Sequence, residues 1–455
     1  MKSSSSKSLN RISPKKNKSM APSESNRASA SVLLVQDPDR LTDVNTKQAR
    51  LIQLLDQESA DAVLLQAPSN ISWFAAGADI HRSASDLSAT SVFVTRDARL
   101  FATNSIDSAQ IFEREAFGLG FQLKQREWFQ PHDDLLQDLC RGRKVLSDAG
   151  SDFTTYAGKQ IRSVRLPLTE LEVQRLRTLS KVVIHSVEST ARHVTTGKTE
   201  AKVAAEISHR LIKRTVAPVK ISVAADGRNH RYRHWSFSED PIQRYAVLSC
   251  TGRRWGLHVS VTRTVCLDSV PTQLWKDYQQ ALLVHATALY FTRHNERLCD
   301  VWKKVQRIYE KFGMTDEWKQ ASQASVVGHS NREVQLTPES RFRLNCPVPV
   351  FWHPSVGSAM LGDTMMCLET ANEHLTHSES WPKVAVKVKG RSVECPSILR
   401  VRQSDEFDKT AALPMDASGQ LTIQDDSDDQ SPDEIESLWE MRTVQSLEPS
   451  DSGSA

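Results

Sequence analysis

The sequence lacks the features that mark membrane-spanning and secreted chains. No apolar run approaches the ~18–20 residues that a bilayer-spanning helix needs, and the longest candidate, residues 281–291, is interrupted by His285. The N-terminus carries Lys and Ser but no apolar segment of the kind found in secretory signals. The seven cysteines are dispersed, and none forms a CxxC pair. This pattern is typical of reduced thiols, so we expect a cytoplasmic protein that makes no membrane contact.

Charge is distributed unevenly along the chain, although the net charge is only +3. Residues 1–31 hold seven Lys and Arg against one acid, Glu24, whereas residues 404–455 hold fourteen Asp and Glu against Lys409 and Arg442. Both ends are poor in apolar residues, so we expect residues 1–45 and 404–455 to be disordered. The middle is mildly basic without a concentrated patch, which makes nucleic acid an unlikely partner.

Within the acidic tail, residues 435–444 carry Leu438, Trp439 and Met441 on a short amphipathic stretch. This stretch is either a docking segment or part of a solvated tail, and the sequence favours the second interpretation.

Two folded parts are expected between these ends. In residues 46–165, helical spacing at 48–57 and 69–76 alternates with predicted strands at 60–65, 91–95, 98–103 and 144–146. Helices that alternate with strands indicate an α/β layer architecture.

In residues 167–403, Thr169 and Glu172 form a capping box that opens a long helix, and Thr199 is expected to cap a second one. Strands follow at 220–224, 245–250 and 256–266, then helices at 271–295 and 300–312. Further strands are predicted at 342–345, 348–352 and 364–369. The repeated order of two helices and then strands predicts an α+β domain of two similar halves.

Several segments of this second part resemble, in order and at compatible spacings, the pita-bread superfamily of creatinase, prolidase, aminopeptidase P and methionine aminopeptidase. They are TELEVQRLRTLSKVVIHSVEST, TTGKTEAKVAAEISHRL, GRNHRYRH, WGLHVSVTRTV, VVGHS and FWHPSVGSAMLGDT. The resemblance implies a creatinase-type N-terminal α/β domain followed by a pita-bread domain of two pseudo-repeated halves. It also implies a homodimer.

The resemblance further implies a hydrolytic site with two divalent metals, held by two Asp, one His and two Glu. Carried over position by position, these ligands fall on Ser249, Ser260, His329, His353 and Gly362. Four of the five expected ligands are therefore replaced, and all four carboxylates are lost. Because neutral hydroxyls cannot offset the charge of two close cations, we expect no dinuclear site.

Alternatives for the remaining polar residues stay open. His329, His353 and Asp363 could hold a single divalent metal such as Zn, Mn or Fe, although no cofactor is the simpler expectation. The resemblance makes His234 a substrate-site histidine. Ser249 or Ser260 paired with a His could act as a nucleophile. Two basic clusters could recognise a carboxylate in place of the metals, or could be solvated turns; they consist of Arg228, Arg231, Arg233, Arg253 and Arg254.

Two functions follow from these observations. The favoured one is a catalytically silent homologue that binds a peptide, a small carboxylate or a protein partner. The alternative is an active aminopeptidase or dipeptidase of Xaa-Pro type with a rebuilt single-metal site. Whether the chain is an enzyme stays open at this point, because fold alone does not fix function.

Overall fold

The N-terminal part begins with a helix that the sequence placed too late. The computed structural model describes residues 36–80, 90–345 and 347–402. Helix α1 spans Pro38–Gln57, eight residues ahead of the predicted boundary at residue 46. It starts there because the Asp37 side chain accepts a hydrogen bond from the backbone N–H of Arg40 and because Pro38 fits the first turn. Of the residues predicted to be disordered, 1–35 and 404–455 lie outside the described residues.

A six-stranded mixed sheet forms the centre of this part, in the order β4-β3-β2-β1-β5-β6. Its buried strands β1 (Ala62–Leu65), β2 (Ser91–Val94) and β3 (Arg99–Asn104) carry apolar side chains on both faces. The edge strands are β4 (Gln122–Arg126) and β6 (Thr155–Tyr156), and β5 is Val145–Ser147. The helices are α1, α2 (Pro68–Phe74), α3 (Ser108–Gln110), the π-helical η1 (Ile111–Glu115), α4 (His132–Cys140) and α5 (Gly158–Arg165). The predicted α/β layer is confirmed.

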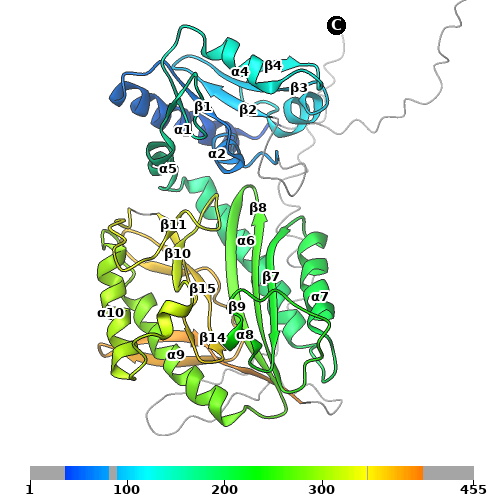
Figure 1. Ribbon diagram of the computed structural model, residues 1–455, viewed down its shortest axis with the longest axis vertical. Helices are drawn as coiled ribbons and strands as arrows, with labels where there is room; N and C mark the ends of the chain where they lie inside the picture. The colour runs from blue at the N-terminus through cyan, green and yellow to red at the C-terminus, as the bar shows by residue number, and fades with distance from the viewer. Residues whose placement is uncertain (1–35, 81–89, 346, 403–455) are drawn as a thin grey trace, which may run out of the picture. The chain divides into compact units, whose positions relative to one another are not determined.

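The first half of the second part packs two helices on one face of an antiparallel sheet (Figure 1). Helix α6 (Glu170–Ala191) opens with the predicted Thr169–Glu172 capping box, and α7 (Glu200–Lys213) is capped by Thr199. Strands β7 (Ala217–Ala225), β8 (Tyr245–Arg254) and β9 (Leu257–Leu267) follow, with the short α8 (Arg228–Arg231) between β7 and β8.

The second half repeats the plan with α9 (Thr272–Phe291), α10 (Leu298–Lys311) and a sheet ordered β11-β10-β12-β15-β16. The predicted strand at 342–345 is wrong, because this segment makes only an isolated bridge between Arg343 and Arg297. One strand of this sheet that was not predicted is β10, Ala324–Val326. The others are β11 (Val334–Gln335), β12 (Val348–Trp352), β15 (Asp363–Cys367) and β16 (Asn372–His374). Shorter elements are η2 (Glu317–Gln320), β13 (Ser355–Val356) and β14 (Ala359–Met360).

The two halves meet where β9 and β15 touch. The backbone N–H of Thr262 donates to the Gly362 carbonyl at 2.9 Å, and the side chain of Thr364 on β15 bonds to the backbone of Ser260 on β9. A hairpin of β17 (Lys383–Val388) and β18 (Arg391–Pro396) follows, and β19 (Leu399–Val401) pairs in parallel with β9. The predicted fold class, α+β with an N-terminal α/β part and a two-halved second part, is confirmed. Within the described residues, no helix is both long and apolar enough to cross a bilayer.

Candidate functional site

Polar residues alternate with apolar ones along the strands of the first half. In β8, Ser249 and Thr251 flank Cys250, and in β9, Ser260 and Thr262 flank Val261. Because successive side chains in a strand point to opposite faces, the apolar set turns toward α6 and α7. Cys250 is 1% exposed in that core. The hydroxyls, together with Ser222 of β7, form the opposite face, called here the hydroxyl face.

Hydrogen bonds connect the members of the hydroxyl face to one another. The hydroxyls of Ser249 and Thr262 are 2.9 Å apart, and those of Thr251 and Ser260 are 2.7 Å apart. The Thr364 hydroxyl accepts from the Ser260 backbone N–H at 3.1 Å and donates to the Ser260 carbonyl at 2.7 Å. The predicted positions Ser249, Ser260 and Gly362 therefore lie close together, and their polar atoms bond mainly to neighbouring hydroxyls and backbone.

Gly362 has no space for a side chain. A Cβ atom added there would lie 2.6 Å from Thr262 Oγ1, 2.8 Å from Thr262 Cβ and 3.1 Å from Phe351 Cε2. The first two distances are shorter than real Cβ atoms tolerate. Glycine is needed here because the backbones of β15 and β9 approach closely, and a carboxylate at this position would require one of the two strands to move.

His353 follows β12 and lies near this face, surrounded by positive charge. Its ring stacks on Phe351 with the centroids 4.7 Å apart, and Phe351 pairs with Thr364 across the sheet. Burial, with the charges of Lys220, Arg332 and His234, lowers the pKa of His353 to about 3. The imidazole is therefore neutral at physiological pH, and the exposed His234 belongs to the same surroundings.

His329 takes part in a different group of side chains. Its Nε2 atom lies 2.7 Å from Glu172 Oε1, and the same oxygen is 2.6 Å from Lys47 Nζ. Lys47 also contacts Asp43 at 2.6 Å, and all four side chains are buried. Burial alone would raise the pKa of Glu172, but the charge of Lys47 and the contact with His329 lower it below its usual value. Burial lowers the pKa of His329, which favours its neutral form.

Strand register separates His329 from His353. The backbone N–H of His353 donates to Gln323 at one end of the β10–β12 pair, and that of Val327 donates to Pro349 near the other end. Four residues separate Gln323 from Val327, or about 13 Å at the usual rise of a strand. The structure therefore does not bring the two histidines to one metal.

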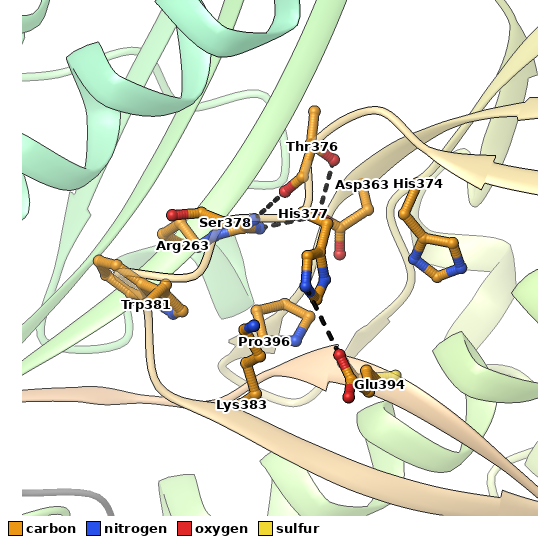
Figure 2. A pocket seen from close by; sticks show the side chains of 11 residues that line it. Arg263, Asp363, His374, Thr376, His377, Ser378, Trp381, Lys383, Glu394 and Pro396 are labelled. Carbon is orange, nitrogen blue, oxygen red and sulfur yellow. Dashed lines mark hydrogen bonds and ion pairs between the residues drawn. The ribbon is translucent and has the colours of Figure 1, made fainter. Parts of the chain in front are cut away.

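Asp363 precedes Thr364 in β15, so its side chain points to the opposite side of the strand. There it belongs to a buried ionic group with Arg263 (Figure 2). It contacts Arg263 at 3.0 Å, His285 at 2.9 Å and the Thr376 hydroxyl at 2.8 Å. Arg263 also contacts Glu188 at 3.2 Å. Burial would raise the pKa of Asp363, but Arg263 and the hydrogen bonds from His285 and Thr376 lower it. Figure 2 shows the pocket beside this group, which His374 and His377 also line.

Two of the five arginines in the basic clusters pair with carboxylates of the chain itself. Arg228 pairs with Glu200 and Asp240, and Arg233 pairs with Glu317 at 2.7 Å. Two further arginines lie over aromatic rings: Arg231 over Tyr232 and Arg254 over Trp255. These four guanidinium groups therefore already contact side chains of the protein.

The donor set does not fit a metal ion. In residues 36–80, 90–345 and 347–402, no three His, Cys, Asp or Glu side chains come together in a way that could hold one. The hydroxyl face offers neutral oxygens, while His329 and Asp363 already bond to protein groups.

Sequence reasoning missed the cations beside this face. Lys220 and Ser222 alternate with Ile221 and Val223 in a predicted strand, so their shared face could have been inferred from period two. Arg332 lies in a loop that follows β10 and had no such signal.

Comparisons with known proteins show which family and which solved structures the chain resembles. A model of metallopeptidase family M24 matches residues 173–339. Among solved structures, the Xaa-Pro dipeptidase of Bacillus anthracis is similar with a TM-score of 0.65 and 16% identity, over 79% of this chain and 100% of that one. The X-Pro aminopeptidase of Thermotoga maritima gives 0.61 and 16%, over 78% and 99%.

A third similar structure is the N-terminal domain of FACT complex subunit SPT16 from Cicer arietinum, with a TM-score of 0.57 and 12% identity, over 74% of this chain and 97% of that one. No curated protein sequence matches the chain. The chain has the pita-bread fold of prolidases and Xaa-Pro aminopeptidases, and its residues 173–339 carry the sequence pattern of metallopeptidase family M24.

Proposed function

We propose that the chain is a peptide-binding homologue of the Xaa-Pro peptidases that lacks their two-metal chemistry. The observation that carries this proposal is the hydroxyl face. Ser249 and Ser260, at two positions where the resemblance places aspartates, bond to Thr262 and Thr251. Gly362, where it places a glutamate, has no room for a side chain.

The physical argument concerns charge. Two divalent ions a few Å apart repel each other strongly, so they need several anionic oxygens between and around them. The hydroxyl face supplies only neutral oxygens, and the charges of Lys220, Arg332 and His234 lower the pKa of the neighbouring His353. Positive surroundings disfavour a cation and favour an anionic ligand such as a peptide carboxylate.

The test combines metal content with turnover. The purified full chain is stripped with chelator, loaded separately with Mn, Co or Zn, dialysed and measured by elemental analysis. Xaa-Pro dipeptides and longer Xaa-Pro peptides are then offered as substrates. We expect less than stoichiometric metal and no hydrolysis above that of a matched His353→Ala variant.

Near-stoichiometric metal, with turnover that His353→Ala abolishes, would instead establish a hydrolase with a rebuilt site. An His329→Ala variant serves as a second comparison, because His329 bonds to Glu172 rather than to the hydroxyl face. Loss of metal in both variants would contradict the separation of the two histidines.

A further inference from the structure

Two cationic side chains, those of Lys220 and Arg332, lie at one end of the hydroxyl face. Lys220 pairs with Thr251 across β7 and β8, and Thr251 pairs with Ser260, so Lys220 shares their face. The loop that carries Arg332 begins at Gly328, whose carbonyl accepts the backbone N–H of His258, two residues before Ser260. Both cations therefore lie at the same end of this face, and both are exposed.

Lys220 and Arg332 have no acidic partner in the part of the chain that the structure describes. Among the residues that the structure describes, no carboxylate lies within ion-pair distance of the Lys220 or Arg332 side chain. Partial desolvation by the surrounding protein and the charge of Arg332 lower the pKa of Lys220, and the charges of Lys220, Arg332 and His234, which lower the pKa of His353, are all positive. An anion held between these groups would relieve their mutual repulsion.

An aromatic loop lies against β7 close to Lys220, because the backbone N–H of Val223 donates to the Ser236 carbonyl and the Ser222 hydroxyl donates to the Trp235 carbonyl. The buried Glu200 carboxylate accepts hydrogen bonds from the Trp235 indole and from Ser238, which fixes the segment between β7 and β8. This segment presents Tyr232, 46% exposed, and Phe237, 48% exposed. Fixed aromatic side chains provide contact area at little entropic cost, so an acidic chain with a few apolar side chains suits this surface.

We propose that Lys220 and Arg332 form the charged part of a binding site for an acidic peptide, and that residues 425–436 of the chain itself are its ligand. This inference rests on the proposed binding function and names the ligand of that site. Residues 425–436 carry seven Asp and Glu and no Lys or Arg, and the apolar Leu438 and Trp439 follow after Ser437. The charge and composition of this segment match those of the surface.

The connecting chain is long enough. The described residues end at Arg402, just after β19, whose Val401 pairs with Leu267 of β9. Leu267 is seven residues from Ser260, or about 23 Å along the strand. The 23 residues from 402 to 425 can extend to about 80 Å. A ligand on such a tether has an effective concentration in the millimolar range, so weak contacts suffice to keep it bound.

The test measures fluorescence anisotropy of a labelled peptide with the sequence of residues 424–439, at low ionic strength. A counterpart with Asn and Gln in place of Asp and Glu is the neutral probe. The proteins are the full chain and a full chain whose own tail is neutralised by Asp425→Asn, Asp426→Asn, Asp428→Asn and Asp429→Asn. We expect the tail-neutralised chain to bind the acidic probe at least about tenfold more tightly, because its own segment no longer competes.

In the tail-neutralised chain, Lys220→Gln with Arg332→Gln should weaken binding about tenfold for each cation removed. Arg141→Gln with Lys303→Gln removes the same charge from exposed positions on other elements and should change binding less than about twofold. Circular dichroism checks that each variant is folded.

The proposed site would be overturned if both double variants lost the same amount of affinity for the acidic probe. It would also be overturned if the neutral probe bound as tightly as the acidic one. Equal affinity of the wild-type and tail-neutralised chains would overturn residues 425–436 as the ligand. These experiments measure binding constants for a peptide, so they can fail without affecting the proposed function. The proposed function would be overturned only by metal uptake together with turnover.

Discussion

Replacing Gly362 tests its close contact with Thr262 of β9. This contact leaves no room for the glutamate that the resemblance places at position 362. A methyl group at this position would overlap Thr262 Oγ1 and Cβ, and Phe351 lies 3.1 Å away. Overpacking of this kind costs about 1–3 kcal/mol, whereas the loss of backbone freedom in the unfolded state returns about 0.4–1 kcal/mol. We therefore expect Gly362→Ala to lower the free energy of unfolding by about 1–2 kcal/mol. Gly362→Glu should cost at least about 3 kcal/mol, because it also buries a charge.

The assay is equilibrium unfolding in urea, followed by circular dichroism. Gly328→Ala is the control, because a Cβ atom there would meet its nearest neighbour, Glu333 Oε1, at 3.3 Å, and should cost less than about 1 kcal/mol. In a Thr262→Gly background, Gly362→Ala should become at least about 1 kcal/mol less costly, since both overlapping atoms are gone. A Gly362→Ala variant as stable as the wild type would refute the close approach of β9 and β15.

Three further predictions concern charge. The double change Ser249→Asp with Ser260→Asp should destabilise the chain in chelator and recover stability with Mn or Zn, measured as thermal midpoints, because two carboxylates on one face need a cation. The change Lys47→Met should cost about 3–5 kcal/mol in urea unfolding, because it leaves buried carboxylates without their cation. Because the pKa values of Glu172 and Asp363 are lowered in the folded chain, their stabilisation is complete above about pH 4.5 and falls as pH drops below it, in acid unfolding monitored by fluorescence.

A specific experimental result would contradict each of these three predictions. No metal-dependent recovery in the aspartate variant would mean that the two serines do not lie close enough to share an ion. Lys303 is exposed, so Lys303→Met should change the free energy of unfolding very little. If Lys47→Met changed it equally little, the buried ion pairs of Lys47 would be contradicted. Stability that is flat from pH 6 to pH 3 would contradict ionised, paired carboxylates.

The sequence predicted the repeated elements well because their signals are local. The strands predicted at 245–250 and 256–266 correspond to β8 and β9, and the Thr169–Glu172 box located the start of α6. Asp37 at the start of α1 was overlooked, because its cap lies within a polar stretch that reads as disordered.

The candidate site was harder to predict because it depends on register and long-range packing. Motif order alone grouped His329 with His353, whereas the β10–β12 pairing sets them apart and Glu172 binds His329. Arg332 carries no local pattern, since only the loop after β10 determines where it lies.

The buried charges around Lys47 also bear on how the chain folds. Lys47 comes from α1, Glu172 from α6 and His329 from the loop after β10. The buried ionic group therefore forms only when three distant stretches of the sequence come together. If any one of them were missing, the others would bury an ion without its counterpart, at a cost of several kcal/mol. Partly assembled forms are therefore penalised, and residues 36–402 should unfold as one cooperative unit instead of domain by domain.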